Sequence, residues 1–140
     1  MPYWRLFYHI VWSTKNREPL LKATWEQDLY GYIWGKSTAL SCEPHAINGM
    51  DDHIHVAIPI PPRHSISTFV GQLKGSSSRY INQVLEPSGT FAWQSSYGVL
   101  TLSEESLPRV VQYIQFQKEH HNKGQMSPTI GDYCKGFIIP

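Results

Sequence analysis

Two histidines separated by a single residue, His53 and His55, are the side chains in this sequence best suited to chemistry. They belong to the segment 49–58, which ends in a run of alternating β-branched residues. Because side chains on a strand alternate between its two faces, both imidazoles are predicted on one face, with Ile54 and Val56 on the other. Two imidazole nitrogens side by side on a rigid strand form half of a metal site. The pair also fits a second interpretation, in which both histidines are simply polar residues on a solvated sheet face.

The last predicted helix carries further polar groups at helical spacing. The segment 103–106 is typical of a helix cap, and the helix is predicted to continue to about residue 123. Tyr113 and Gln117 are four residues apart, which makes them neighbours at one margin of the apolar stripe, with His120 close to the same line. The amide oxygen of Gln117, combined with two histidine nitrogens, suits Mg²⁺ or Mn²⁺ better than a structural zinc. The alternative is a Tyr113 at the rim of the core and a solvated Gln117.

The hydrophobic periodicity predicts the order strand, helix, strand, strand, helix, strand, helix. The elements are expected at 3–12, 25–40 (capped by Thr24), 43–50, 53–58, 65–84 (begun by Ser65 or Ser67), 91–102 and 103–123. This order is that of the split βαβ, ferredoxin-like fold of the α+β class, an antiparallel sheet with helices on one face. The first and third strands then lie at the centre of the sheet. His53 and His55 are left on the open face, beside His9 of the first strand, where only the extra C-terminal helix remains to cover them.

The composition describes one globular domain spanning 1–140, with a poorly defined tail from about residue 124. The 12 Lys and Arg residues against 11 Asp and Glu argue against a protein that coats nucleic acid by charge alone, but they leave room for a local basic groove. Lys74 and Arg79 bracket a run of small residues at 75–78 and are candidates for contacts with DNA phosphates. An ordinary basic surface is the alternative.

The expected location is the cytoplasm. Cys42 and Cys134 show no C-x-x-C spacing, which favours two free thiols in a cytosolic protein. Arg5 and His9 interrupt the first apolar run, so it does not have the pattern of a signal peptide. No stretch approaches the ~20 apolar residues that a membrane helix needs. We therefore expect a cytoplasmic protein without a membrane partner.

Four segments, in the same order along the chain, resemble a known family. They are Tyr-His-Ile-Val-Trp-Ser-Thr-Lys at 8–15, Asp-His-Ile-His-Val at 52–56, Leu-Lys-Gly-Ser-Ser-Ser-Arg at 73–79, and Tyr-Ile-Gln-Phe-Gln-Lys-Glu-His-His at 113–121. Together they resemble the single-tyrosine HUH transposases, which include the TnpA-type enzymes of small insertion sequences and the REP-associated tyrosine transposases. The resemblance runs from about residue 8 to residue 122.

The resemblance implies a DNA transposase that cleaves and rejoins single-stranded DNA at hairpin-flanked ends. Tyr113 would be the nucleophile, leaving a 5′-phosphotyrosine and a free 3′-hydroxyl. His53, His55 and Gln117 would hold one Mg²⁺ or Mn²⁺ ion. The sequence shows no certain general base for the tyrosine proton, and the candidates are the nearby metal, a water, or His120 as an auxiliary group. The resemblance also implies a homodimer in which the tyrosine helix of one chain can serve the histidines of the other.

Three other interpretations compete with this one. An RNA-recognition module of the same fold would carry the aromatic RNP signature, which the sequence lacks. A zinc hydrolase would use His53, His55 and a third histidine, and it would not need Tyr113. The third is a domesticated or non-catalytic protein that binds hairpin DNA or RNA but no longer moves DNA.

Overall fold

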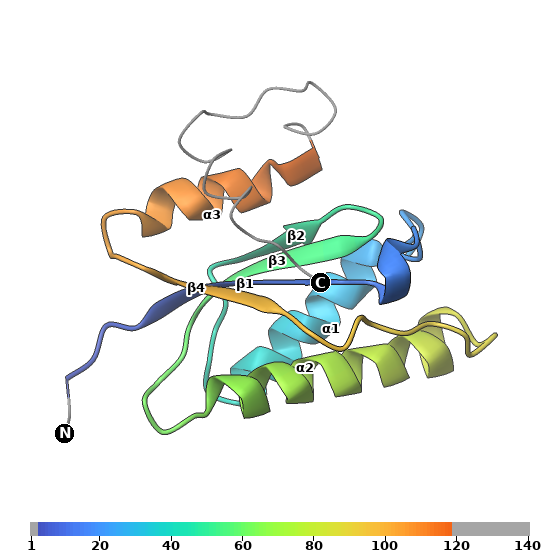
Figure 1. Ribbon diagram of the computed structural model, residues 1–140, viewed down its shortest axis with the longest axis horizontal. Coiled ribbons are helices and arrows are strands. Elements are labelled where there is room, and N and C mark those ends of the chain that lie inside the picture. The colour runs from blue at the N-terminus through green and yellow to red at the C-terminus, as the bar shows by residue number, and fades with distance from the viewer. Residues whose placement is uncertain (1–2, 119–140) are drawn as a thin grey trace.

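The computed structural model describes residues 3–118 (Figure 1). Its elements, in chain order, are β1 (Phe7–Ser13), the short helix η1 (Lys15–Arg17), α1 (Glu26–Ala39), β2 (Ala46–Gly49), β3 (His53–Pro59), α2 (Ile66–Tyr80), the π-helical turn η2 (Ile81–Leu85), β4 (Gly98–Leu102) and α3 (Leu107–Gln115). No helix within these residues is long and apolar enough to cross a bilayer.

The four strands form one antiparallel sheet in the order β2-β3-β1-β4. β1 and β3 lie at its centre and share a seven-residue register that runs from Phe7 opposite Pro59 to Ser13 opposite His53. This is the predicted ferredoxin-like arrangement, and the fold prediction is confirmed. The turn from β2 to β3 requires a glycine at position 49, because a Cβ atom there would collide with the backbone of His53.

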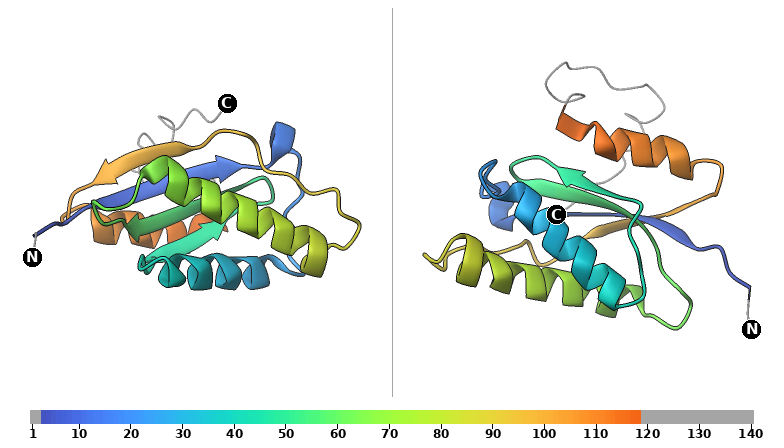
Figure 2. Two further views of the ribbon diagram at one scale, coloured as in Figure 1. Left: turned by 90° about the horizontal axis from the view of Figure 1, so that it is seen from below. Right: turned by 180° about the vertical axis from the view of Figure 1, so that it is seen from behind.

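The two faces of the sheet are covered by different helices. α1 and α2 lie side by side on one face, and α3 lies on the other (Figures 1 and 2). The α1–α2 face buries a large apolar cluster that includes Ile10, Trp12, Leu29, Ile33, Ile54, Val56, Ile58, Phe69 and Leu73. Since the even-numbered residues of β3 all belong to this cluster, His53 and His55 point to the α3 face. The predicted alternation along β3 is confirmed.

Helix starts follow the predicted caps in two cases out of three. Ser65 caps α2, its Oγ accepting from the amide of Thr68 at 3.4 Å, and Ser103 Oγ accepts from the amide of Ser106 just before α3. The prediction that Thr24 caps the first helix is wrong. Thr24 lies in a turn, and the carbonyl of Lys22 accepts from the amides of Trp25 and Glu26 in place of a side chain.

The fourth strand is shorter than the predicted range 91–102. Asn82 hydrogen-bonds to both the amide and the carbonyl of Phe91, at 2.8 and 3.0 Å, and Lys74 Nζ donates to the carbonyls of Gln94 and Ser96. These side-chain contacts occupy backbone groups that a longer strand would use for pairing. The segment before β4 therefore makes one isolated bridge, between Trp93 and Thr14.

Two other predicted boundaries also differ. β2 covers only Ala46–Gly49 of the predicted range 43–50. α3 ends at Gln115, where Phe116 adopts a turn before the chain is helical again at 117–118. The predicted continuation to residue 123 lies outside the described residues. Cys42 is a buried free thiol, as expected, and Cys134 also lies outside the described part of the chain.

Candidate active site

β3 carries two neighbouring imidazoles on the face covered by α3. The ring centroids of His53 and His55 are 5.0 Å apart, with the planes at 77°. Their exposed fractions are 8% and 4%, because α3 closes over them. The alternative of two polar residues on a solvated face therefore does not hold.

Each imidazole is held through its Nδ1 atom by a different partner. His53 Nδ1 lies 2.7 Å from Oδ1 of Asp52, and His55 Nδ1 lies 2.8 Å from Nε2 of His9. Asp52 also forms an ion pair with Arg17, whose Nη2 lies 3.3 Å from Oδ2. These contacts orient both rings through Nδ1, so that Nε2 is the nitrogen with which each ring would bind a metal ion.

Two acid–base properties follow from these surroundings. Burial opposes ionisation of the Asp52 carboxyl, but the hydrogen bond from His53 and the charges of His53 and Arg17 outweigh it and hold the pKa of Asp52 below its ordinary value. Burial lowers the pKa of His9 to about 3. His9 is consequently a neutral imidazole at pH 7.

α3 brings Tyr113 to the histidines of the same chain. The Tyr113 ring packs edge-on to His55, with 6.1 Å between the ring centroids and 82° between the planes. Gln117 follows one turn later and is 1% exposed, while Tyr113 is 4% exposed. The alternative of a rim tyrosine and a solvated glutamine is therefore wrong. An apolar cluster around Tyr113 docks the helix; its members are Phe7, Ala46, Ala57, Leu102, Val110 and Ile114.

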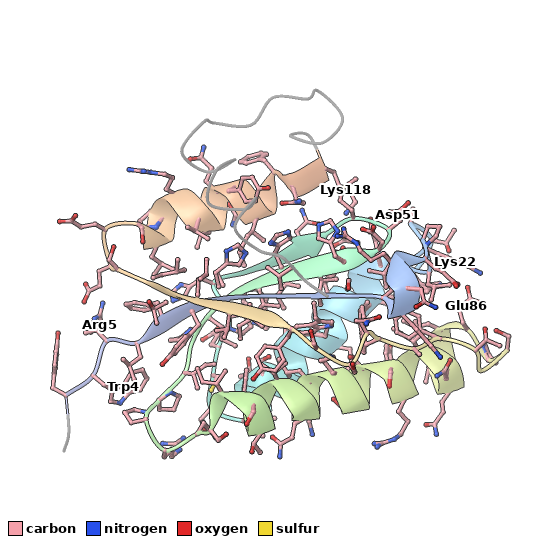
Figure 3. The ribbon with its side chains drawn as sticks, in the orientation of Figure 1. Trp4, Arg5, Lys22, Asp51, Glu86 and Lys118 are labelled. Carbon is pink, nitrogen blue, oxygen red and sulfur yellow. The ribbon has the colours of Figure 1, made fainter. Side chains whose placement is uncertain are left out.

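The end of α3 is anchored by Lys118. Its Nζ donates to Asn48 Oδ1 at 3.1 Å and to the carbonyl of Gly49 at 2.9 Å, and it lies 3.1 Å from Oε2 of Glu26. Asn48 Nδ2 in turn donates to the carbonyl of Gln115 at 3.1 Å. In Figure 3, Lys118 lies at the end of α3 beside the turn that carries Asp51. These contacts fix the helix at the turn immediately after Tyr113.

The donor set fits a hard divalent cation. Among residues 3–118, no group of three or more His, Cys, Asp and Glu side chains is arranged to hold a metal. His53, His55 and Gln117 would instead supply two imidazole nitrogens and one amide oxygen, and all three are buried on the same face as Tyr113. Both imidazoles are already oriented through Nδ1, as metal-binding histidines usually are.

The predicted DNA contacts lie away from the histidines. Lys74 and Arg79 belong to α2, on the opposite face of the sheet from α3 (Figure 1). Lys74 is partly buried, which lowers the pKa of its ammonium, and it donates to the carbonyls of Gln94 and Ser96. Arg79 lines a hollow of about 250 Å³ together with Lys36, Gly71, Gln72, Gly75 and Ser76. His120, the predicted auxiliary group, lies outside the described residues.

Sequence reasoning missed two residues of the site, Asp52 and Lys118. Asp52 was given no role of its own, although a carboxylate directly before the histidine pair was a usable signal. Lys118 carried no signal, because its partners Asn48 and Glu26 are distant in sequence. The contacts of Lys118 with Asn48 and Glu26 depend on how the strands and helices pack together. The residue spacing within one segment does not predict such packing.

Comparison with known proteins agrees with this architecture. The family described as "Transposase IS200 like" matches residues 2–117. The ISDra2 transposase TnpA of Deinococcus radiodurans is 29% identical over 121 residues, covering 83% of this chain and 86% of that protein. The IS200 transposase of Salmonella typhimurium is 27% identical over 132 residues, covering 87% of this chain and 83% of that protein.

Two solved structures have the same fold. A crystal structure of a Deinococcus radiodurans R1 protein, provisionally assigned as a transposase, superimposes with a TM-score of 0.66 at 31% identity and covers 84% of this chain and 95% of its own. A REP-associated tyrosine transposase bound to a REP hairpin gives a TM-score of 0.64 over 86% of this chain and 74% of its own, and at 17% identity it supports the fold alone. The family match spans β1 to the end of α3, so the chain belongs to the IS200-like transposase family.

Proposed function

We propose that this transposase cleaves and rejoins single-stranded DNA at hairpin-flanked ends, with Tyr113 as the nucleophile. The observation that carries the proposal is the burial of Tyr113 against His55, on the one sheet face that also holds His53 and Gln117. Both imidazoles are also held through Nδ1, so the groups beside the phenol are already oriented, as a catalytic site requires.

The reaction is a transesterification at phosphorus. The Tyr113 oxygen attacks the scissile phosphorus and loses its proton. The bond from phosphorus to the 3′ oxygen breaks, and the leaving 3′ oxygen keeps the electron pair and takes up a proton. The product is a 5′-phosphotyrosine and a free 3′-hydroxyl. Because the new ester retains the energy of the old one, a second 3′-hydroxyl can reverse the step without ATP.

The groups around Tyr113 have distinct roles in this proposal. His53, His55 and Gln117 hold one Mg²⁺ or Mn²⁺ ion. When bound, such a cation supplies positive charge that polarises the scissile phosphate. Asp52 keeps the His53 ring in place through Nδ1. His120 stays a predicted auxiliary group for proton transfer.

The DNA partner is a single strand that folds into hairpins. Support comes from the hairpin bound to the REP-associated transposase of the same fold. Arg79, with Lys36 across the hollow between α1 and α2, offers two cations to the phosphate backbone. Lys74 is proposed as a further DNA contact, although its ammonium already bonds to two carbonyls of the segment before β4.

We also propose a cytoplasmic homodimer of single-domain chains, each spanning 1–140. Within the described residues, β4 pairs with β1 on one side and ends the sheet on the other. An edge strand of this kind can pair with a second copy. In the described chain Tyr113 packs against His55 of its own subunit. Sharing of Tyr113 between subunits is a proposal that mixed dimers test.

The decisive experiment is covalent capture of DNA. A labelled single-stranded hairpin oligonucleotide is incubated with the protein and Mg²⁺ or Mn²⁺, and the denatured products are separated by size. Wild type is expected to form a protein–DNA adduct. Tyr113→Phe keeps the buried ring but removes the nucleophile, so it should abolish the adduct while gel-shift binding of the hairpin persists. The matched control is Tyr32→Phe, at a ring stacked on Tyr80 between α1 and α2.

Three outcomes would contradict parts of the proposal. An adduct that survives Tyr113→Phe places the nucleophile elsewhere. Cleavage that persists in EDTA removes the metal role. If wild type binds the hairpin but forms no adduct, the protein is the non-catalytic hairpin binder of the same fold. Mixing Tyr113→Phe and His53→Ala chains restores the adduct only if subunits share their sites.

A further inference from the structure

His9 is a fully buried imidazole that the proposed chemistry does not consume. It lies in the middle of β1, on the face that also carries Phe7 and Val11, and it is 0% exposed. A polar side chain among such apolar neighbours is unfavourable unless it is hydrogen-bonded. Its Nε2 atom lies 2.8 Å from Nδ1 of His55, and the two ring centroids are 5.0 Å apart.

The strand register produces this contact. His9 is opposite Ala57 and Val11 is opposite His55, so the His9 and His55 rings meet along the diagonal of the β1–β3 pair. Diagonal neighbours on one face are within reach of long or aromatic side chains. Since β1 and β3 are the two central strands, the contact lies at the centre of the sheet, away from both edges.

We propose that His9 is a positioning residue that fixes the tautomer and the orientation of His55 for metal binding through Nε2. The inference rests on the proposed metal role of His55, and it extends that role to a residue on a different strand. Histidine ligands generally bind a metal through one ring nitrogen while the other donates to a fixed acceptor.

The direction of the hydrogen bond follows from counting protons. Two neutral imidazoles share a single proton in the contact between His9 Nε2 and His55 Nδ1. If His55 binds a cation through Nε2, that atom has a lone pair and the proton of His55 is on Nδ1. His55 then donates and His9 accepts. In the reverse arrangement His55 carries its proton on Nε2 and cannot act as a ligand there.

His53 is also oriented through Nδ1, but its partner is a carboxylate. His53 Nδ1 lies 2.7 Å from the Asp52 carboxylate, which can only accept while it is ionised. A carboxylate therefore selects the Nδ1–H tautomer of His53 by its own chemistry. An imidazole acceptor can carry its own proton on either ring nitrogen. The direction of the His9–His55 hydrogen bond therefore depends on packing that fixes both rings.

Two substitutions at position 9 separate hydrogen bonding from packing. His9→Leu fills similar space without an acceptor, whereas His9→Gln can place an amide oxygen near the position of Nε2. Mn²⁺ binding to the full-length protein is measured by electron paramagnetic resonance without DNA. His9→Leu is expected to weaken Mn²⁺ binding by about 10–100-fold, and His9→Gln should recover most of the loss. Tyr8→Phe, at the preceding residue of β1, whose side chain packs on the α1–α2 face, is the matched control and should bind as wild type does.

A second readout does not depend on metal. ¹⁵N chemical shifts of the histidine rings in the metal-free protein report which nitrogen of His55 carries the proton. Wild type, Tyr8→Phe and His9→Gln should show His55 protonated on Nδ1, and His9→Leu should show a mixture of tautomers. His55 protonated on Nε2 in wild type, or a His9→Leu spectrum unchanged at His55, would overturn the inference.

The two readouts separate failure of this inference from failure of the proposed function. If wild type binds no Mn²⁺ but His55 loses its tautomer in His9→Leu, the metal role fails and His9 still orients His55. If Mn²⁺ binds equally to wild type and to a folded His9→Leu, the metal role stands and the positioning role of His9 is wrong. Circular dichroism establishes that each variant is folded.

Discussion

The two faces of the central sheet bury side chains of different chemistry. The α1–α2 face holds the larger cluster, built from apolar residues such as Leu29, Ile54 and Phe69 that are 0–1% exposed. The α3 face holds a smaller apolar cluster, and buried polar side chains lie among it: His9, His53, His55 and Gln117. Burial of apolar area stabilises the first face, whereas each polar group on the second must recover its desolvation cost through a hydrogen bond. One strand, β3, contributes to both faces, because its side chains alternate between them.

Stability should depend mainly on the α1–α2 face. Leu29→Ala removes a fully buried side chain from α1 and leaves a cavity. We expect the free energy of unfolding to fall by about 2–5 kcal/mol, measured by urea denaturation. Leu100→Ala, at a leucine of β4 that is 37% exposed, is the control and should change stability much less. Equal effects of the two substitutions would mean that this cluster does not carry the stability of the fold.

The difference between the faces also decides what the sequence could predict. The alternation of β3 and the apolar periodicity of α2 are local signals, so the fold and the placement of His53 and His55 followed from them. Helical spacing predicted that Tyr113 and Gln117 are neighbours, and both are buried on the α3 face; their roles stay predictions. The start of β4 was not predictable, because Asn82 and Lys74 occupy the backbone groups of the preceding segment from another element. Such side-chain contacts between different elements produce no periodic pattern in the sequence.

Function should depend mainly on the α3 face. Asp52→Asn keeps the size of the side chain but removes the charge that holds His53 through Nδ1 and pairs with Arg17. We expect Mn²⁺ affinity to fall by about 10–100-fold, with a similar loss of DNA adduct at subsaturating metal. The denaturation midpoint should change little, since the turn and the core remain intact.

The neighbouring carboxylate provides the matched control for that substitution. Asp51 belongs to the same turn, and its side chain is exposed. Asp51→Asn removes one negative charge at nearly the same place, so it corrects for long-range electrostatics. If Asp51→Asn weakens Mn²⁺ binding as much as Asp52→Asn does, the effect is one of net charge and not of holding His53.

The two faces are joined at Lys118, where the smallest of the expected effects arises. Lys118 lies in the helical residues just after α3, and its partner Glu26 begins α1 on the other face of the sheet. Lys118→Met keeps the aliphatic stem but removes the bonds to Asn48, Gly49 and Glu26. The Lys118 side chain is 39% exposed, so we expect a loss of only about 1–2 kcal/mol. Most of this loss should appear as local opening of α3.

Hydrogen exchange distinguishes local opening from a general loss of stability. In Lys118→Met the amides of α3 around Tyr113 should exchange faster, while those of β1 and β3 keep their protection, because helix undocking is a sub-global event. Adduct formation should slow in proportion to the opened fraction. Lys118→Arg, which retains the charge and the donors, should restore protection. If protection is lost in the whole sheet instead, α3 is part of the core, and the separation of a stability face from a chemistry face is wrong.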